Sequence, residues 1–160
     1  MPPSSRPFPA ATLRALLDRM VPPDDFPGAV EAGVEDYVHR QLAGDCSREA
    51  GALTSGLRQL DAEAAARHSV NFDALSPANQ DTLLRDLEAG LVSPTWPAEI
   101  SPLTFFARMV ELAHEGYYAD PANGGNRDGS SWRMIGYDPR LPPPPLPTEA
   151  IPAPPSSRSP

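Results

Sequence analysis

The sequence predicts an all-α fold: a small bundle of about five helices, an irregular segment rich in glycine and aromatic residues, and a proline-rich tail. Apolar residues recur three or four positions apart in five segments, which is the repeat of one helix face. Two of these segments open with serine followed by proline, a pair typical of helix starts. In no segment do apolar and polar residues alternate as they do in a half-buried strand.

The first predicted helix starts at Pro9, since proline fits a first turn. It stops at Val21 because Pro22 and Pro23 follow and a residue before proline avoids the helical region. A loop over residues 24–28 leads into the second helix. The apolar faces are Leu13, Leu16, Leu17 and Met20 in the first helix, and Ala29, Ala32, Tyr37, Val38 and Leu42 in the second.

The third predicted helix follows Asp45. Ser76-Pro77 and Ser101-Pro102 open the fourth and fifth, and Gly90 ends the fourth. The apolar faces are Leu53, Leu57, Leu60 and Ala64 in the third, Leu83, Leu84 and Leu87 in the fourth, and Phe105, Phe106, Met109, Leu112 and Ala113 in the fifth. Beyond Gly116 the sequence is too rich in glycine for a further helix to be predicted.

One folded domain is predicted, over residues 9–138. Residues 1–8 are rich in proline and serine, and residues 139–160 contain ten prolines. We expect the first stretch to be disordered and the second to be an extended or disordered tail, since neither holds the apolar residues of a core.

Deletion of residues 142–160 should leave the midpoint of thermal unfolding almost unchanged, because an unpacked tail buries little apolar area. Melting curves of the full-length and truncated chains test this. A large loss of stability would instead mean that the tail packs on the body or on a partner.

The charge of the chain argues against two classes of partner. The formal net charge is −8, and all 13 basic residues are arginines. An acidic chain without a basic stripe is poorly suited to nucleic acid, because phosphate contacts supply much of that affinity. An anionic membrane surface would repel it, and direct membrane insertion is not expected because no apolar stretch is long enough. The lack of lysine and the 22 prolines are typical of a GC-rich genome, and a bacterial source would fit this composition.

The first twenty residues contain neither a twin arginine nor the apolar core of a signal peptide. We therefore expect the chain to be made in the cytoplasm and to stay there. It would reach the periplasm only if a signal-bearing partner carried it.

No complete catalytic or cofactor site is predicted. His39, His68 and His114 lie far apart, and no carboxylates join them at metal-ligand spacing. No strand precedes Gly124-Gly125 and no lysine follows, so a phosphate-binding loop is not predicted. We expect this chain to hold no metal, FAD or NAD, and its lone Cys46 to be a small buried side chain.

Asp24-Asp25 leaves two interpretations open. Adjacent carboxylates could serve acid–base chemistry. The sequence favours a structural role, in which the aspartates cap the following helix and interact with its positive end.

The segment 116–138 is the most informative part of the sequence. Its tyrosines, tryptophan and arginine, placed among glycines, are typical of the centre of a protein interface. Aromatic residues that fold back to close the chain's own core would give the same pattern, with Trp132 favouring the interior and Tyr118 and Arg133 a partner. The candidate partner-interface residues are Asp24, Asp25, Tyr117, Tyr118, Asn126, Trp132, Arg133 and Tyr137.

Three groups of residues carry a resemblance to a known family. The groups are Val21-Pro22, Asp24, Pro27-Gly28-Ala29 and Ala32-Gly33-Val34; then Gly56-Leu57, Leu60-Asp61 and Phe72; and finally Gly116-Tyr117-Tyr118, Gly124-Gly125-Asn126, Trp132 and Ile135-Gly136-Tyr137. In this order, over about residues 10–138, they resemble the gluconate 2-dehydrogenase subunit 3 family.

The resemblance implies an accessory role. Members of that family are small subunits of dehydrogenases whose large subunit is a flavoprotein of the glucose–methanol–choline family. The large subunit holds FAD and the catalytic residues, and a cytochrome c is a candidate electron acceptor. By resemblance, this chain would bind the large subunit as a heterodimer, help it to fold or mature, and contribute no redox centre to sugar or polyol oxidation. Many members carry a twin-arginine signal, from which this sequence departs.

A second class of function stays open at this stage. A free-standing helical adaptor could dock a peptide-binding domain through residues Pro142 to Pro147, as proline-rich segments do. Such a role would leave the aromatic segment unexplained. Co-purification with a flavoprotein distinguishes the two.

Overall fold

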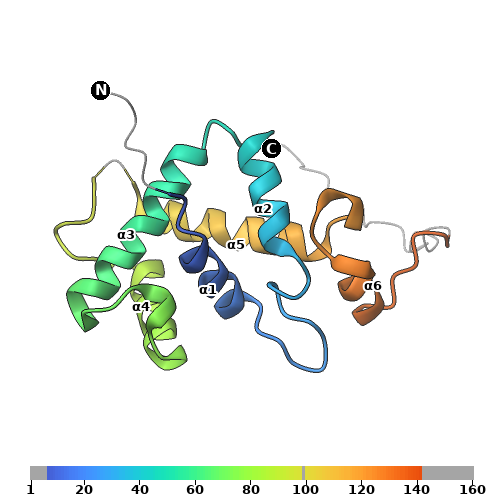
Figure 1. The fold of residues 1–160 in the computed structure, drawn as a ribbon, viewed down its shortest axis with the longest axis horizontal. Helices are drawn as coiled ribbons and strands as arrows, with labels where there is room; N and C mark the ends of the chain where they lie inside the picture. Colours follow the sequence, from blue (N-terminus) through green and yellow to red (C-terminus); the bar gives the residue numbers. More distant parts are fainter. Residues whose placement is uncertain (1–6, 99, 142–160) are drawn as a thin grey trace, which may run out of the picture.

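The computed structural model describes residues 7–98 and 100–141, and within them the chain forms α-helices and short 3₁₀ turns but no strand. The α-helices are α1 (Ala10–Met20), α2 (Val34–Ala43), α3 (Ala50–His68), α4 (Pro77–Glu88), α5 (Pro102–Tyr118) and α6 (Ser130–Met134). The 3₁₀ turns are η1 (Phe72–Ala74), η2 (Pro121–Asn123) and η3 (Arg127–Gly129). Helix α5 runs along the long axis, with α1 and α2 in front of it and α6 near its end (Figure 1). The predicted all-α class is confirmed.

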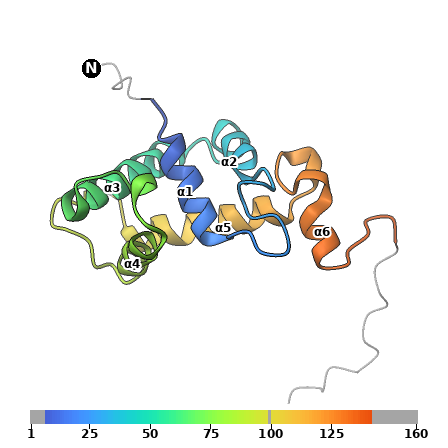
Figure 2. The same ribbon diagram turned by 60° about the horizontal axis from the view of Figure 1, so that its bottom comes forward.

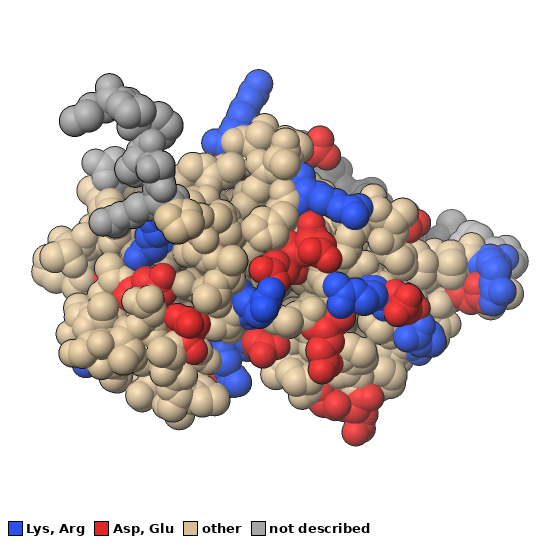
Figure 3. Space-filling view, in the orientation of Figure 1, with Lys and Arg blue, Asp and Glu red and all other residues tan. Residues whose placement is uncertain are grey.

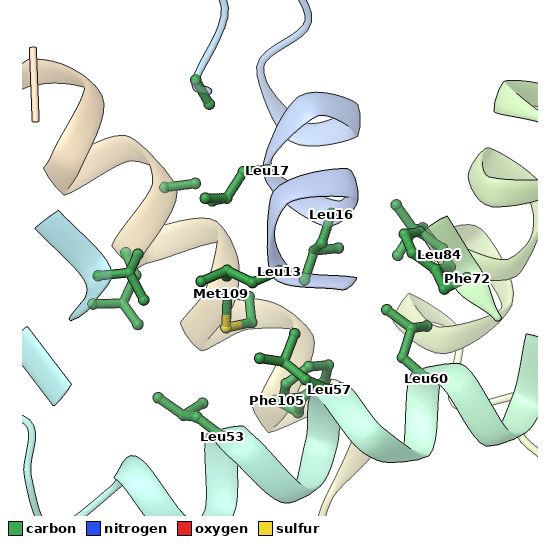
Figure 4. Close-up of a cluster of buried hydrophobic side chains, with 14 of the residues drawn as sticks. Leu13, Leu16, Leu17, Leu53, Leu57, Leu60, Phe72, Leu84, Phe105 and Met109 are labelled. Carbon is green, nitrogen blue, oxygen red and sulfur yellow. The ribbon is translucent and has the colours of Figure 1, made fainter. Parts of the chain in front are cut away.

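Helix α1 is the centre of the core, where it contacts α2, α3, α4, α5 and η1. Its leucines, Leu13, Leu16 and Leu17, are fully buried. Figure 4 shows them among side chains of α3, α4, α5 and η1, with Met109 of α5 close by. Burial of one leucine stabilises a fold by about 1.5–3 kcal/mol, so this helix secures the packing of the rest.

The predicted ends of three helices are confirmed. Helix α1 ends at Met20, directly before Val21 and the two prolines. Helices α4 and α5 both begin at a proline that follows a capping serine. The Ser76 hydroxyl accepts a hydrogen bond from the Asn79 amide at 3.4 Å, and the Ser101 hydroxyl accepts one from the Thr104 amide at 3.2 Å.

The predicted second helix is too long at its start. Residues 29–33 form turns, and α2 begins only at Val34 because Gly33 has φ +77°, a left-handed conformation that ends any helix running through it. Ala29 and Ala32 are nevertheless fully buried, as their apolar pattern suggests. The expected capping by Asp24 and Asp25 is wrong, since Gly33 occupies the cap position without a side-chain hydrogen bond.

The segment after Gly116 contains more helix than predicted. Helix α5 continues through Gly116 to Tyr118, and α6 forms a further short helix within the glycine-rich stretch. At Gly116 an added Cβ would lie 2.9 Å from side-chain carbons of Val34 and Tyr37. Glycine is therefore present because α2 packs closely on α5, which its helix propensity does not reveal.

The predictions for the termini lie mostly outside the described residues, which exclude residues 1–6 and 142–160.

Among the described helices, none combines the length and the apolar character that a membrane span needs. Arginine and acidic side chains alternate over the face shown in Figure 3, so this face carries no basic stripe.

Candidate functional site

The loop after α1 meets the last turn of α5 and the nearby α6 in space, although about ninety residues separate them. The Tyr117 hydroxyl donates a hydrogen bond of 2.7 Å to the Pro27 carbonyl oxygen. A hollow of about 330 Å³ lies between the two parts, with Val21 and Asp24 on one wall and Tyr117, Tyr118 and Met134 on the other. The structure thus joins the two sequence regions from which the candidate residues were drawn.

Asn126 holds the C-terminal segment together from inside. Its side chain is fully buried, and its amide nitrogen donates to the Ala119 carbonyl oxygen at 2.9 Å. Its amide oxygen accepts two hydrogen bonds from Ser131, one from the backbone amide at 2.9 Å and one from the hydroxyl at 2.7 Å. These bonds link the end of α5 to the start of α6, so they fix the direction in which α6 leaves the body.

Gly125 brings the segment into backbone contact with α5. A Cβ added at this position would collide with the carbonyl group of Gly116. Backbone atoms cannot move aside as a flexible side chain can, so no larger residue fits. The neighbouring Arg127 amide donates to the Ala32 carbonyl oxygen at 2.8 Å, which fastens the segment to the turn before α2 as well.

Several large side chains of this rigid segment face outward. Tyr118, Ile135 and Tyr137 are exposed by 45%, 57% and 52%, Arg133 is exposed, and Trp132 is half-buried. We refer to these five residues as the aromatic surface. Single exposed apolar residues are ordinary, whereas a cluster that includes tyrosine, tryptophan and arginine is typical of a partner-binding surface.

The rings of this surface are held by contacts within the chain. The Trp132 indole nitrogen donates to the Tyr118 carbonyl oxygen at 3.0 Å. Trp132 and Tyr137 stack edge to face with centroids 5.1 Å apart, and Tyr118 does the same with Tyr117 at 5.2 Å. Arg133 donates to the Asp128 carbonyl oxygen. Side chains fixed before binding lose little conformational entropy when a partner arrives.

The aspartates of the first loop have unequal roles. The Asp24 carboxylate accepts a hydrogen bond of 2.8 Å from the Phe26 amide, which closes the turn in its own loop. Asp24 also lines the hollow beside Tyr117, whereas Asp25 is exposed on the same loop and does not line it. Asp24 is therefore the member of the pair that adjoins the aromatic segment.

Two candidate interface residues are placed inside the chain. Tyr117 is 4% exposed and Asn126 is fully buried, so both support the aromatic surface and neither forms part of it. Their burial follows from hydrogen bonds to partners 7 and 90 residues away, which spacing along the chain does not reveal.

Ile135 lies on the aromatic surface, but the sequence analysis identified it only as part of the family motif and not as an interface residue. The sequence analysis also did not predict an additional apolar face on α5. The sequence did carry a sign of it: Phe105 and Phe106 are adjacent and so point about 100° apart on a helix, and only one of them can face the core fully. The structure buries Phe105 and leaves Phe106 half-buried.

The other chemically interesting residues are scattered. Within residues 7–98 and 100–141, no three His, Cys, Asp or Glu side chains come together as a metal site would require. Cys46 is buried, as predicted, and accepts a hydrogen bond from the Arg108 guanidinium at 3.1 Å. That arginine also pairs with Glu49, at 2.9 Å, so its charge is balanced within the chain.

Replacement of Tyr117 by phenylalanine should lower the free energy of unfolding by about 1 kcal/mol, because a half-buried hydrogen bond to Pro27 is lost. Chemical denaturation measures this. The matched control is Tyr118→Phe, which removes a hydroxyl from the exposed neighbouring ring and should change stability by less than about 0.5 kcal/mol. Equal effects of the two changes would contradict the assigned role of the Tyr117 hydroxyl.

The same tyrosine gives a pH dependence. Burial, with a smaller contribution from Tyr118 and Asp24, raises the pKa of Tyr117 above its usual value of 10.0. Above pH 10 the unfolded chain therefore loses its proton before the folded chain does, and the free energy of unfolding falls as the pH rises. Burial and Glu115 raise the pKa of Tyr37 as well, so Tyr117→Phe should reduce this alkaline loss without abolishing it.

Comparison with known proteins gives one result. The family model for gluconate 2-dehydrogenase subunit 3 matches residues 9–139, which includes the core, both joined loops and the whole aromatic surface. No curated protein and no solved structure matches the chain.

Proposed function

Because the chain belongs to the gluconate 2-dehydrogenase subunit 3 family, we propose that it is a non-catalytic small subunit that binds and stabilises a large flavoprotein subunit. The large subunit, of the glucose–methanol–choline family, would hold FAD and oxidise a sugar or polyol. This chain would supply a folded surface and no redox centre.

The aromatic surface is the observation that carries the proposal. Tyr118, Trp132 and Tyr137 present large rings beside Arg133, and the buried Asn126 holds them in place. Interfaces concentrate their binding energy in a few tyrosine, tryptophan and arginine residues near the centre. The surface lies at one end of the molecule, where the loop that bears Asp24 and Asp25 extends it (Figure 2).

Stabilisation of the large subunit follows from binding itself. A partner that binds only the folded form of a protein raises its apparent stability by mass action, by about 2.7 kcal/mol at a hundredfold excess over Kd. A small subunit with no chemistry of its own can thus increase the amount of active flavoprotein. It would do so during maturation, when the large subunit is most exposed to misfolding.

Co-expression with the glucose–methanol–choline flavoprotein of the same genome tests the proposal. We expect the two chains to co-purify as a heterodimer and the flavin absorbance to belong to the large chain. The isolated small chain should show no flavin spectrum and oxidise no sugar. Stoichiometric flavin in the isolated small chain, or failure of the two chains to co-purify, would contradict the proposal.

A further inference from the structure

Helix α5 carries a second, mostly apolar stripe that the other described elements cover only in part. The stripe consists of Leu103, Phe106, Ala107, Val110, His114 and Tyr118, which lie on one side of the helix. Its first member is 54% exposed and its last is 45% exposed, and the last belongs to the aromatic surface. In Figure 2, α5 runs along the lower edge of the body, from α4 to the neighbourhood of α6.

The stripe is the floor of a groove. A hollow of about 410 Å³ surrounds Leu103 and Ala107, and one of about 320 Å³ lies between α4 and α5 at Val110. The two share Phe106, Val110 and Glu88. The second also shares Met20 and His114 with the hollow beside Tyr118. The three hollows therefore form one groove that ends at the aromatic surface, and Figure 3 shows the molecule indented between α4 and the loop after α1.

The dimensions of the groove suit a helix. Its floor spans residues 103–118, which at 1.5 Å per residue is about 22 Å, or four turns. The described residues offer no free sheet edge to which an extended peptide could add as a strand. An amphipathic helix that lays apolar residues into a hydrophobic groove is the remaining common mode of recognition with this geometry.

The charges along the groove indicate what the helix carries. Glu88 lines one end and Asp24 lines the other. Between them, Arg19 and Asp81 neutralise each other through two bonds of 2.8 and 2.9 Å, and Arg85 lines the wall close to them. An occupant with one basic side chain facing Glu88, another facing Asp24 and an acidic one between them complements this pattern.

We infer that the groove between α4 and α5 binds an amphipathic helix of the large flavoprotein subunit, with a basic side chain near each end of that helix. This inference rests on the proposed function. The groove opens directly into the aromatic surface, so one partner can fill both without a gap. The combined contact would extend from Leu103 to Tyr137, beyond the small patch formed by the aromatic surface alone.

Site-specific photocrosslinking in the co-expressed complex tests the inference. A benzoylphenylalanine placed at Leu103 reports on the far end of the groove, and one at Tyr118 reports on the aromatic surface. The control position is Ala66, which is exposed on α3 and lines none of the hollows. We expect both test positions, but not the control, to crosslink to the large subunit, and the peptide joined to position 103 to come from a helix with apolar residues three or four apart.

A charge placed in the groove gives a second readout. Ala107→Glu should lower the amount of co-purified large subunit about tenfold or more, since a second carboxylate would be enclosed beside Glu88 without a basic side chain of its own. Ala66→Glu makes the same change on an exposed helix face and should have no effect. Unchanged circular dichroism of both variants separates loss of binding from loss of folding.

The outcomes distinguish the inference from the proposed function. If the large subunit co-purifies and crosslinks from position 118 but not from position 103, and Ala107→Glu binds normally, the groove inference is wrong while the proposed function stands. Crosslinks from position 103 to a second copy of this chain would also overturn the inference. If no large subunit co-purifies with the unaltered chain, both are wrong.

Discussion

Tyr118→Ala and Arg133→Ala should each reduce recovery of the active large subunit on co-expression by about tenfold or more. Truncation of a central tyrosine or arginine in an interface commonly costs 2 kcal/mol or more, and about 1.4 kcal/mol corresponds to a tenfold change in affinity. Both side chains are exposed and neither fills the core. Helical circular dichroism of the isolated variants should therefore match that of the unaltered chain.

Two matched controls separate the interface from general surface effects. Val70→Ala shortens an apolar side chain that is 41% exposed near the end of α3, away from α6 in Figure 1. Arg48→Ala removes an exposed arginine from the turn between α2 and α3. This turn follows the C-terminal end of α2, whereas Gly33 lies at the other end of that helix. Neither control should affect recovery. If both test variants yield a fully active complex, recognition lies elsewhere on the chain.

The helices were predictable because local chemistry fixes them. Proline after Val21 ends α1, and Ser76 and Ser101 cap helices whose first residue is proline. The apolar repeats also identified nearly all of the core leucines, such as Leu16 and Leu60. These features depend on residues within one or two turns of one another, which is the range over which sequence patterns are informative.

The misassigned residues depend on contacts between distant parts of the chain. Asn126 resembles a loop residue, yet it is fully buried because the end of α5 and the start of α6 both bond to it. Gly116 suggests the end of a helix, yet it lies within α5 where α2 packs closely. Spacing along the chain carries no information on such partners.

The aromatic surface could be predicted only in part for the same reason. The residue types of the segment pointed to an interface, and five of its residues do face outward. Which rings point outward is decided by the hydrogen bonds of the Asn126 side chain, and these are visible only in three dimensions. The interior side chains of the segment are therefore as important to the surface as its exposed rings.

Asn126→Ala should lower the free energy of unfolding by about 3–4 kcal/mol. Three side-chain hydrogen bonds disappear, each worth about 1 kcal/mol, and the buried Ser131 amide is left without its acceptor. Residue 126 also has φ +48°, a left-handed conformation that costs alanine about 1 kcal/mol more than it costs glycine. Urea denaturation, followed by circular dichroism, measures the loss.

A series at the same position separates these contributions. Asn126→Gly removes the hydrogen bonds without backbone strain, so it should be about 1 kcal/mol less harmful than Asn126→Ala. Asn126→Asp keeps an acceptor oxygen for Ser131. It also replaces the amide group that donates to the Ala119 carbonyl oxygen, so that a carboxylate oxygen lies against that carbonyl oxygen. Asn126→Ala and Asn126→Gly should expose the Ser131 amide to faster hydrogen exchange and, through the displaced α6, lower the affinity for the large subunit. Unchanged stability and exchange in Asn126→Ala would show that the network does not hold the segment, and that the aromatic surface owes its shape to other contacts.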